Sequence, residues 1–329
     1  MLVRGEKMFI SILLLKKILS MFVALAVGYI IVKSKLLKSE DSKTLSKILA
    51  FIGSPCAIFL SFMVDFTLDV GMGILIAAIV AVLLHICYIV LAQIFAKVLR
   101  LKKIEQAGII YSNAGYLTIP LVYAVLGAEM VVYTCAYSVV QTILIWTHAK
   151  TLVADQLIVD DGAKKKEVLK IFCNPNFIAI YLGIAAMIVG IRPPEIIEVA
   201  AQDFAGLLAP LSMLVVGMLM AKVKLVDLAR ESKIYLVCVI RLIVIPLFSI
   251  GVIYLTSVVI ESLGMRYSNM SEIFMVVLWA AAGPVANAIT QLSQIYGGDE
   301  EYAGKMTMMS LVLCVVTMPL MTMLCMNIL

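Results

Sequence analysis

Long apolar runs separated by short polar connections make up almost the whole of this chain. A helix needs about 20 mostly apolar residues to cross a bilayer. The stretches that meet this requirement are residues 9–32, 44–64, 71–96, 104–126, 130–153, 174–191, 200–221, 233–260, 271–296 and 303–328. They are too continuously apolar for the alternating strands of a membrane barrel. The pattern therefore predicts an all-α integral membrane protein with ten transmembrane helices.

The charges of the connections predict how the chain is oriented. Lysine and arginine cluster in the first, third, fifth and seventh connections, whereas the even-numbered connections carry only Arg192 and Arg266. Positively charged loops stay in the cytoplasm, so we expect both termini outside and the long connection 154–173 inside. Basic residues within the first 17 positions run against this rule.

The long connection divides the chain into two halves of five predicted helices each. We expect a first repeat at 1–153, a cytoplasmic loop at 154–173 and a second repeat at 174–329. Because five is odd, the second half enters the membrane in the opposite direction, which is the plan of an inverted repeat. Pro55 and Pro210 occupy matching second helices of the two halves.

The composition supports the membrane assignment. The chain is 63% hydrophobic and 14% charged, whereas soluble domains average about half apolar and a quarter charged. The net charge of +5 lies in the connections, as topology signals do, so we predict no nucleic-acid partner. The seven cysteines show no spacing typical of a zinc site or a disulfide framework.

The sequence contains no signature of catalysis. Nucleotide-binding loops, metalloprotease pairs and nucleophile elbows are absent. No aspartate or glutamate lies near the middle of a predicted span, which disfavours a carboxylate proton relay. We therefore expect neither an enzyme nor a cofactor.

The fourth and ninth predicted helices are each interrupted by polar residues, glycine and proline, at 113–120 and 283–291. Paired interruptions in two halves indicate a transporter binding site, because freed backbone groups in lipid must be buried in protein or line a wet cavity. The amino ends of half-helices also favour anions. The candidate substrate-binding residues are Asn113, Gly115, Thr118, Pro120, Pro284, Asn287, Thr290 and Gln291. The alternative is a pair of proline kinks that are packed by interhelical hydrogen bonds.

Three further residues within spans carry polar chemistry. Arg241 lies about nine residues into the eighth span. It is a candidate for attracting an anion, for extending to the cytoplasmic side, or for binding a carbonyl freed by Pro246. His85 and His148 are interpreted as hydrogen-bonding residues between helices, with a proton-carrying role as the alternative.

The chain resembles the auxin efflux carrier family, the PIN-type carriers and their bacterial relatives, within the bile, arsenite and riboflavin transporter superfamily. The residues that carry the resemblance are Gly28-Tyr29, Pro55, Asn113 to Leu121, Gly127, Asn174-Pro175, Pro210, Gly217, Pro284 to Tyr296 and Pro319-Leu320. The resemblance implies a scaffold bundle and a transport bundle. It also implies that the fourth and ninth helices cross at their prolines and hold a substrate carboxylate there. Thr118 stands where the family often has glycine.

These observations lead to a predicted function. We expect a multi-pass transporter of the cell membrane that moves a small organic anion, such as a mono- or dicarboxylate, by an alternating-access, elevator-type mechanism. A coupling Na⁺ or H⁺ is left open, and the alternative is a sodium-coupled symporter related to the bile-acid symporters. A membrane-embedded enzyme or signalling protein is the alternative of another class. The oligomeric state is not fixed by the sequence, and a homodimer is compatible with it.

Overall fold

The computed structural model describes residues 16, 19–20, 23–64, 67–153, 173, 175–221, 231–264 and 269–328. All its elements in these ranges are helical, apart from one isolated bridge between two extended residues. The predicted all-α class is therefore confirmed for the described part of the chain. The predicted cytoplasmic connection 154–173 lies outside it, except for Cys173.

The helices of the first half follow the predicted spans closely. They are a helix at Val23–Lys33, η1 (Ser39–Asp41), α2 (Ser42–Ile48), η2 (Leu49–Gly53), α3 (Ser54–Ser61), α4 (Leu68–Leu99), α5 (Lys103–Ile110), η3 (Ala114–Thr118), α6 (Ile119–Val125), α7 (Val131–Leu144), η4 (Ile145–Ala149) and α8 (Lys150–Val153).

The second half differs from the prediction in one span. Its helices are α10 (Pro175–Val189), α11 (Glu195–Gly206), α12 (Leu208–Met220), α14 (Ser232–Val239), η6 (Ile240–Val244), α15 (Ile245–Ser262), α16 (Met270–Ala282), α17 (Asn287–Ile295) and α18 (Glu300–Ile328). The single helix predicted at 200–221 is wrong, because the chain turns at Leu207. Pro210 then falls in the first turn of α12, where a missing amide hydrogen costs no internal bond.

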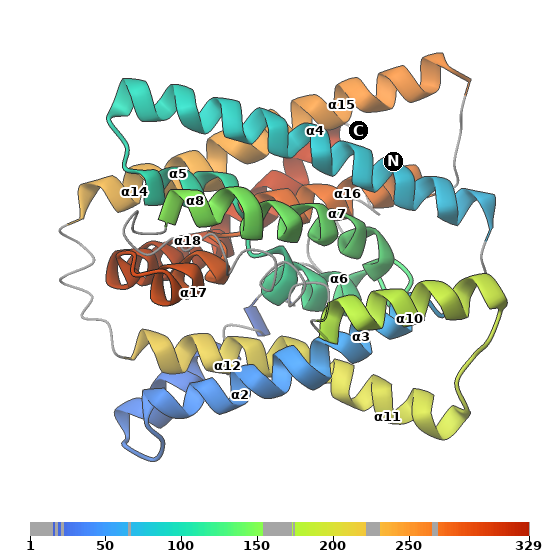
Figure 1. The fold of residues 1–329 in the computed structure, drawn as a ribbon, viewed down its shortest axis with the longest axis horizontal. Coiled ribbons are helices and arrows are strands. Elements are labelled where there is room, and N and C mark those ends of the chain that lie inside the picture. Colours follow the sequence, from blue (N-terminus) through green and yellow to red (C-terminus); the bar gives the residue numbers. More distant parts are fainter. Residues whose placement is uncertain are drawn as a thin grey trace, which may run out of the picture.

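The helices pack as two bundles, and each bundle takes helices from both halves of the chain (Figure 1). In the small bundle (residues 23–61 and 175–220), α3 packs on α10 and α11, and α12 packs on α2. In the large bundle (residues 68–153 and 232–328), α4 packs on α7 and α16, and α18 packs on α14 and α17. The bundles meet where α3 contacts α7 and where α12 contacts α6.

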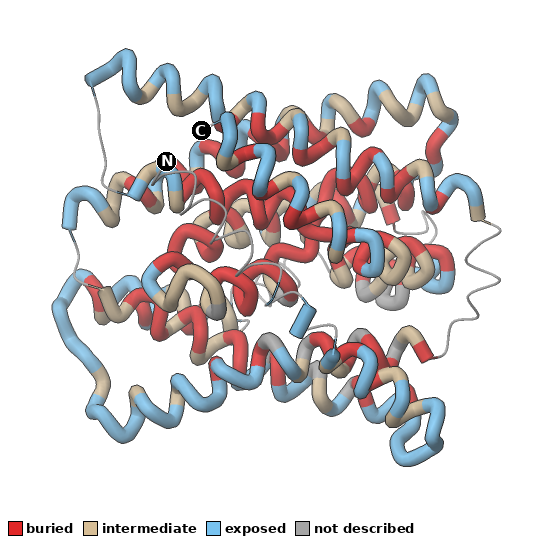
Figure 2. Tube along the Cα trace, turned by 180° about the vertical axis from the view of Figure 1, so that it is seen from behind, coloured by how far each residue is buried: buried red, intermediate tan, exposed pale blue. Residues whose placement is uncertain are grey.

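The outer helices are exposed along much of their length, while the centre is buried (Figure 2). On α4, Leu75, Ile79, Ile86 and Val90 are exposed at helical spacing, and Ala77, Val80, Ala81 and Leu84 on the opposite face are buried. Among the described helices, α4, residues 232–262 and α18 are long and apolar enough to cross a membrane. An exposed apolar stripe of this kind is what a lipid-facing helix requires. The count of ten spans and the inverted repeat stay predictions.

Wide, π-helical turns come directly before several prolines. The pairs are η2 before Pro55, η3 before Pro120 and η6 before Pro246. In each, the residue before the proline donates its N–H to the carbonyl five residues back, as Ile119 does to Ala114. A proline ring clashes with the carbonyl four residues back. The wider turn gives that carbonyl room, so these helices continue past their prolines.

Candidate functional site

The two predicted interruptions lie against each other in the large bundle. Tyr111–Asn113, here called the first break, separates α5 from η3, and residues 283–286, the second break, separate α16 from α17. Asn113 N donates to Pro284 O at 2.8 Å, and Ala286 N donates to Tyr111 O at 3.0 Å. These bonds form an antiparallel bridge between Ser112 and Val285. Each break therefore satisfies backbone groups of the other.

The location of the first break corrects the prediction. Pro284 lies in the second break as expected, but Pro120 lies inside α6, seven residues beyond Asn113. The π-helical turn η3 accommodates the proline. The interruption instead lies at Tyr111–Asn113, where peptide groups of the second break supply the missing partners.

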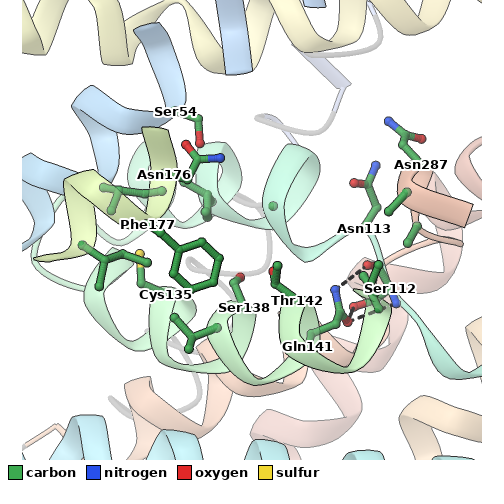
Figure 3. Close-up of a pocket in the computed structure, with 18 of the residues that line it drawn as sticks. Ser54, Ser112, Asn113, Cys135, Ser138, Gln141, Thr142, Asn176, Phe177 and Asn287 are labelled. Carbon is green, nitrogen blue, oxygen red and sulfur yellow. Dashed lines mark hydrogen bonds between the residues drawn. The ribbon is translucent and has the colours of Figure 1, made fainter. Parts of the chain in front are cut away.

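Side chains from neighbouring helices, which the sequence pattern did not indicate, hold both breaks in place. Gln141 of α7 accepts from the Ser112 N–H at 3.2 Å and from its hydroxyl at 2.7 Å, and donates to its carbonyl at 2.8 Å (Figure 3). Val285 N donates to the Ser310 hydroxyl of α18 at 3.0 Å. Helices α7 and α18 each carry several other hydroxyl side chains, so nothing in the sequence distinguished Gln141 or Ser310 from them.

Arg241 lies behind the breaks and is fully buried. Its guanidinium donates to Gly283 O at 3.0 Å, to Ile109 O at 3.1 Å and to Ala281 O. It therefore binds the carbonyl ends of both α5 and α16. Extension to the cytoplasmic side is wrong. Capping of a carbonyl is right in kind, although the acceptors belong to the broken helices and not to the turn before Pro246. Attraction of an anion stays a prediction.

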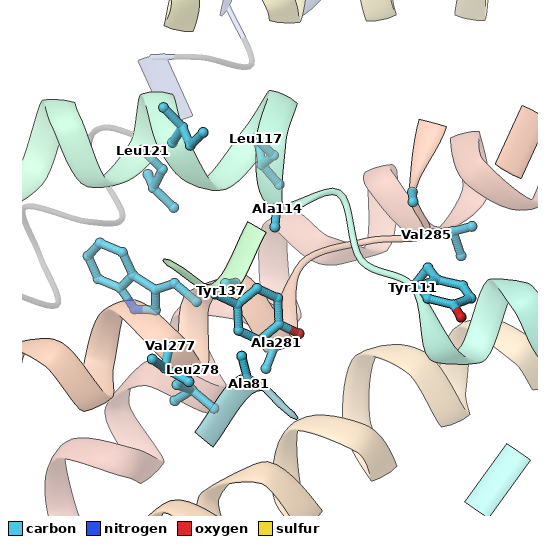
Figure 4. Close-up of a cluster of buried hydrophobic side chains, with 14 of the residues drawn as sticks. Ala81, Tyr111, Ala114, Leu117, Leu121, Tyr137, Val277, Leu278, Ala281 and Val285 are labelled. Carbon is cyan, nitrogen blue, oxygen red and sulfur yellow. The ribbon is translucent and has the colours of Figure 1, made fainter. Parts of the chain in front are cut away.

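Apolar side chains of the breaks pack with those of the neighbouring helices. Tyr111, Ala114, Tyr137, Ala281 and Val285 are buried in one cluster (Figure 4). Close packing of this kind transmits strain and resists deformation. The breaks are thus a fixed part of the large bundle.

A cavity of about 190 Å³ opens beside the breaks, between the two bundles. From the large bundle it is lined by both breaks, by α7 and by η4, and from the small bundle by α3 and α10. Its polar lining residues are Ser54, Ser112, Asn113, Ser138, Gln141, Thr142, Asn176 and Asn287. No charged side chain is among the described residues that line it.

Asn113 and Asn287 lie near each other on the wall formed by the breaks (Figure 3). Within the described residues, neither side-chain amide has a hydrogen-bond partner. η3 and α17 begin here, at Ala114 and Asn287, and present backbone N–H groups and the positive ends of their dipoles. Gly115 adds open space, since a Cβ there would meet nothing within 4 Å. The wall therefore offers several neutral donors to one ligand.

The other predicted site residues lie away from the cavity lining. Thr118 is buried and donates to Trp279 O at 3.4 Å. Thr290 shares a hydrogen bond of 3.3 Å with Thr307. Pro120 and Pro284 are buried and do not line the cavity. The side chain of Gln291 lies outside the described residues.

Both histidines make hydrogen bonds inside the large bundle. His85 Nδ1 lies 2.7 Å from Ala81 O of its own helix, and its ring packs against Tyr137 at 5.1 Å between centroids. His148 Nδ1 lies 2.8 Å from the Tyr111 hydroxyl, directly at the first break. The contact of His148 agrees with the interpretation as a hydrogen bond between helices, whereas the hydrogen bond of His85 stays within α4. The proton-carrying role stays untested.

Comparison with known proteins identifies the family. No curated protein matches the chain. Residues 13–322 match the family described as membrane transport protein. This range includes both breaks and all of both bundles except the last six residues of α18, and it confirms the resemblance found in the sequence. The chain therefore belongs to the membrane transport protein family, that of the auxin efflux carriers and PIN-like transporters.

Proposed function

We propose that this transporter moves a small organic anion through the cavity between its bundles. The observation that carries the proposal is the pairing of the two breaks, which brings two helix amino ends and two amides without a partner among the described residues to one cavity wall. Helix amino ends favour negative charge. Amide and backbone N–H groups bind a carboxylate without placing a second net charge in the membrane.

The dimensions of the cavity favour a small ligand. Pockets for drug-sized molecules measure about 300–1,000 Å³, and this cavity measures about 190 Å³. Phe177 and Trp146 add apolar lining beside the polar wall. A mono- or dicarboxylate with a short carbon skeleton matches this combination.

The two-bundle architecture supports an elevator-type mechanism. The breaks, α7 and η4 belong to the large bundle, whereas the opposite lining belongs to α3 and α10 of the small bundle. Sliding of the large bundle along the small one would carry the anion-binding wall from one membrane face to the other. The proposal includes two inverted halves of five helices in the cell membrane, with both termini outside.

Replacement of the two amides tests this function. Mono- and dicarboxylates are first screened for a rise in the thermal midpoint of the purified protein, because a ligand of the native state stabilises it. In proteoliposomes, Asn113→Ala and Asn287→Ala should each lower uptake of the best ligand about tenfold or more, since each removes a hydrogen bond to a charged group.

The matched control is Asn327→Ala, which removes an exposed amide near the end of α18. It should transport like the original protein. Full transport by both Asn113→Ala and Asn287→Ala would remove the assigned site.

A further inference from the structure

The carbonyl ends of the two broken helices converge on one side chain. Ile109 is near the end of α5, and Ala281 and Gly283 are at the end of α16. All three carbonyls accept from Arg241, which comes from η6 of a third span. The crossing therefore has two poles: its amino ends face the cavity, and its carbonyl ends face a guanidinium.

Converging backbone carbonyls are ligands for a metal cation. Hard cations prefer oxygen ligands, and carbonyl ends of half-helices coordinate the coupling sodium in many carriers with broken helices. The carbonyl ends also carry the negative pole of the helix dipole. By its chemistry this pole of the crossing is a cation site.

In this protein the cation at the three carbonyls is the Arg241 guanidinium. Arg241 is fully buried and makes no ion pair with any described carboxylate. A buried charge without a carboxylate partner is expensive in a membrane. The three carbonyls and the ends of two helix dipoles offset this cost, as they would for a bound ion.

We propose that Arg241 permanently takes the place of a coupling sodium ion, so that this protein neither binds nor requires Na⁺ at the crossing. Arg241 is in this sense a positioning residue, which holds both breaks through their carbonyls and does not touch the ligand. The consequence for transport rests on the proposed anion-carrier function, whereas the prediction about sodium binding does not.

The experiment measures sodium binding by the full-length protein and by three variants. Thermal midpoints are recorded in NaCl and in choline chloride at equal ionic strength, together with binding of ²²Na⁺. Arg241→Met removes the charge and keeps a long apolar side chain. Arg241→Lys keeps the charge and three donors. Lys233→Met is the matched control, because Lys233 donates to the Arg100 carbonyl at 2.9 Å from an exposed position on the same span.

The original protein, Lys233→Met and Arg241→Lys should bind no ²²Na⁺ and show equal midpoints in both salts. Arg241→Met should have a lower midpoint in choline and regain about 2–4 °C specifically in NaCl, because sodium then occupies the freed carbonyls. If Arg241 had a purely structural role, Arg241→Met would lower the thermal midpoint equally in both salts.

Sodium-specific stabilisation or ²²Na⁺ binding by the original protein would overturn the proposal. A folded Arg241→Met variant that responds equally to both salts would overturn it as well. If Arg241→Met does not fold, the original protein and Arg241→Lys decide the question. The carboxylate screen and Asn113→Ala report on anion binding, so a failure of the proposed function is recognised separately from a failure of this inference.

Discussion

Two asparagines and one glutamine place side-chain amides on the cavity wall, but their hydrogen bonds differ. Asn113 and Asn287 face the cavity, and their amides have no hydrogen-bond partner in the part of the chain that the structure describes. Gln141 uses both ends of its amide on the backbone and hydroxyl of Ser112. The asparagines are thus free to bind a ligand, and the glutamine is committed to the backbone of the first break.

Gln141→Leu should destabilise the protein and weaken anion binding together. It leaves buried donors and an acceptor of Ser112 unpaired, at a cost of about 1–3 kcal/mol for each unsatisfied group. Thermal unfolding and carboxylate binding measure the two effects. Gln202→Leu is the control, since Gln202 is an exposed glutamine on α11 that bonds only Glu198 among the described residues. Unchanged stability of Gln141→Leu would contradict the role given to these bonds.

The amino-acid types in the sequence were enough to predict three of the residues that line this cavity wall. Asn113, Gly115 and Asn287 could be selected because polar and flexible residues are unusual in an apolar span. Gln141 and Ser138 of α7 and Asn176 of α10 also line the cavity, but the spans 130–153 and 174–191 carry no interruption in the sequence that would have indicated a site there. Only the packing of α7 and α10 against the breaks shows that they belong to the same site.

At the scale of helices, proline is a poor guide to where a helix breaks. The helix continues past Pro120 because η3 widens before it, whereas the first break lies where no proline occurs. A break in a membrane needs partners for its peptide groups. At Tyr111–Asn113 those partners come from residues 284–286, far away in the sequence. Local pattern therefore predicted that both helices are interrupted, and tertiary contact decided where.

Helix packing in the small bundle depends on close backbone approach. A Cβ at Gly217 of α12 would lie 1.9 Å from Leu25 O, and one at Gly28 would lie 2.1 Å from Leu214 O. Both obstacles are backbone atoms, which cannot rotate away. Small residues at such crossings let helices pack closely in membranes.

Gly217→Ala should therefore lower the free energy of unfolding by about 1–3 kcal/mol or more, through overpacking. Gly251→Ala is the matched control, because Gly251 also lies in a helix and a Cβ there meets nothing within 4 Å. Alanine favours helix over glycine, so this control should be neutral or slightly stabilising. The midpoints of thermal unfolding compare the two variants, and equal midpoints would contradict the packing argument.

For the whole molecule, the contact between the bundles is the surface on which sliding would occur. The Ser61 hydroxyl at the end of α3 lies beside the Cys135 thiol of α7. This pair lies where α3 of the small bundle contacts α7 of the large bundle. The sequence predicted two bundles by family resemblance, but it did not indicate which residues meet between them.

Ser61→Cys should form a disulfide with the native Cys135 under oxidation and stop transport, because the bond would fix one bundle against the other. Uptake in proteoliposomes, with and without a reducing agent, measures this effect, and reduction should restore transport. Ser61→Cys combined with Cys135→Ala should stay active under the same oxidant. Undiminished transport by the fully cross-linked protein would rule out the sliding mechanism at this surface.

The bridge between Ser112 and Val285 uses only peptide groups, and every amino acid except proline supplies both of them. The bridge itself therefore sets no requirement on the cavity-lining amides beside it, Asn113 and Asn287. Gln141, Ser310 and Arg241, which hold the breaks, lack this freedom. A carrier built in this way can change its substrate through a few substitutions at the amides and hydroxyls that line its cavity. The backbone bridge that positions these residues stays the same.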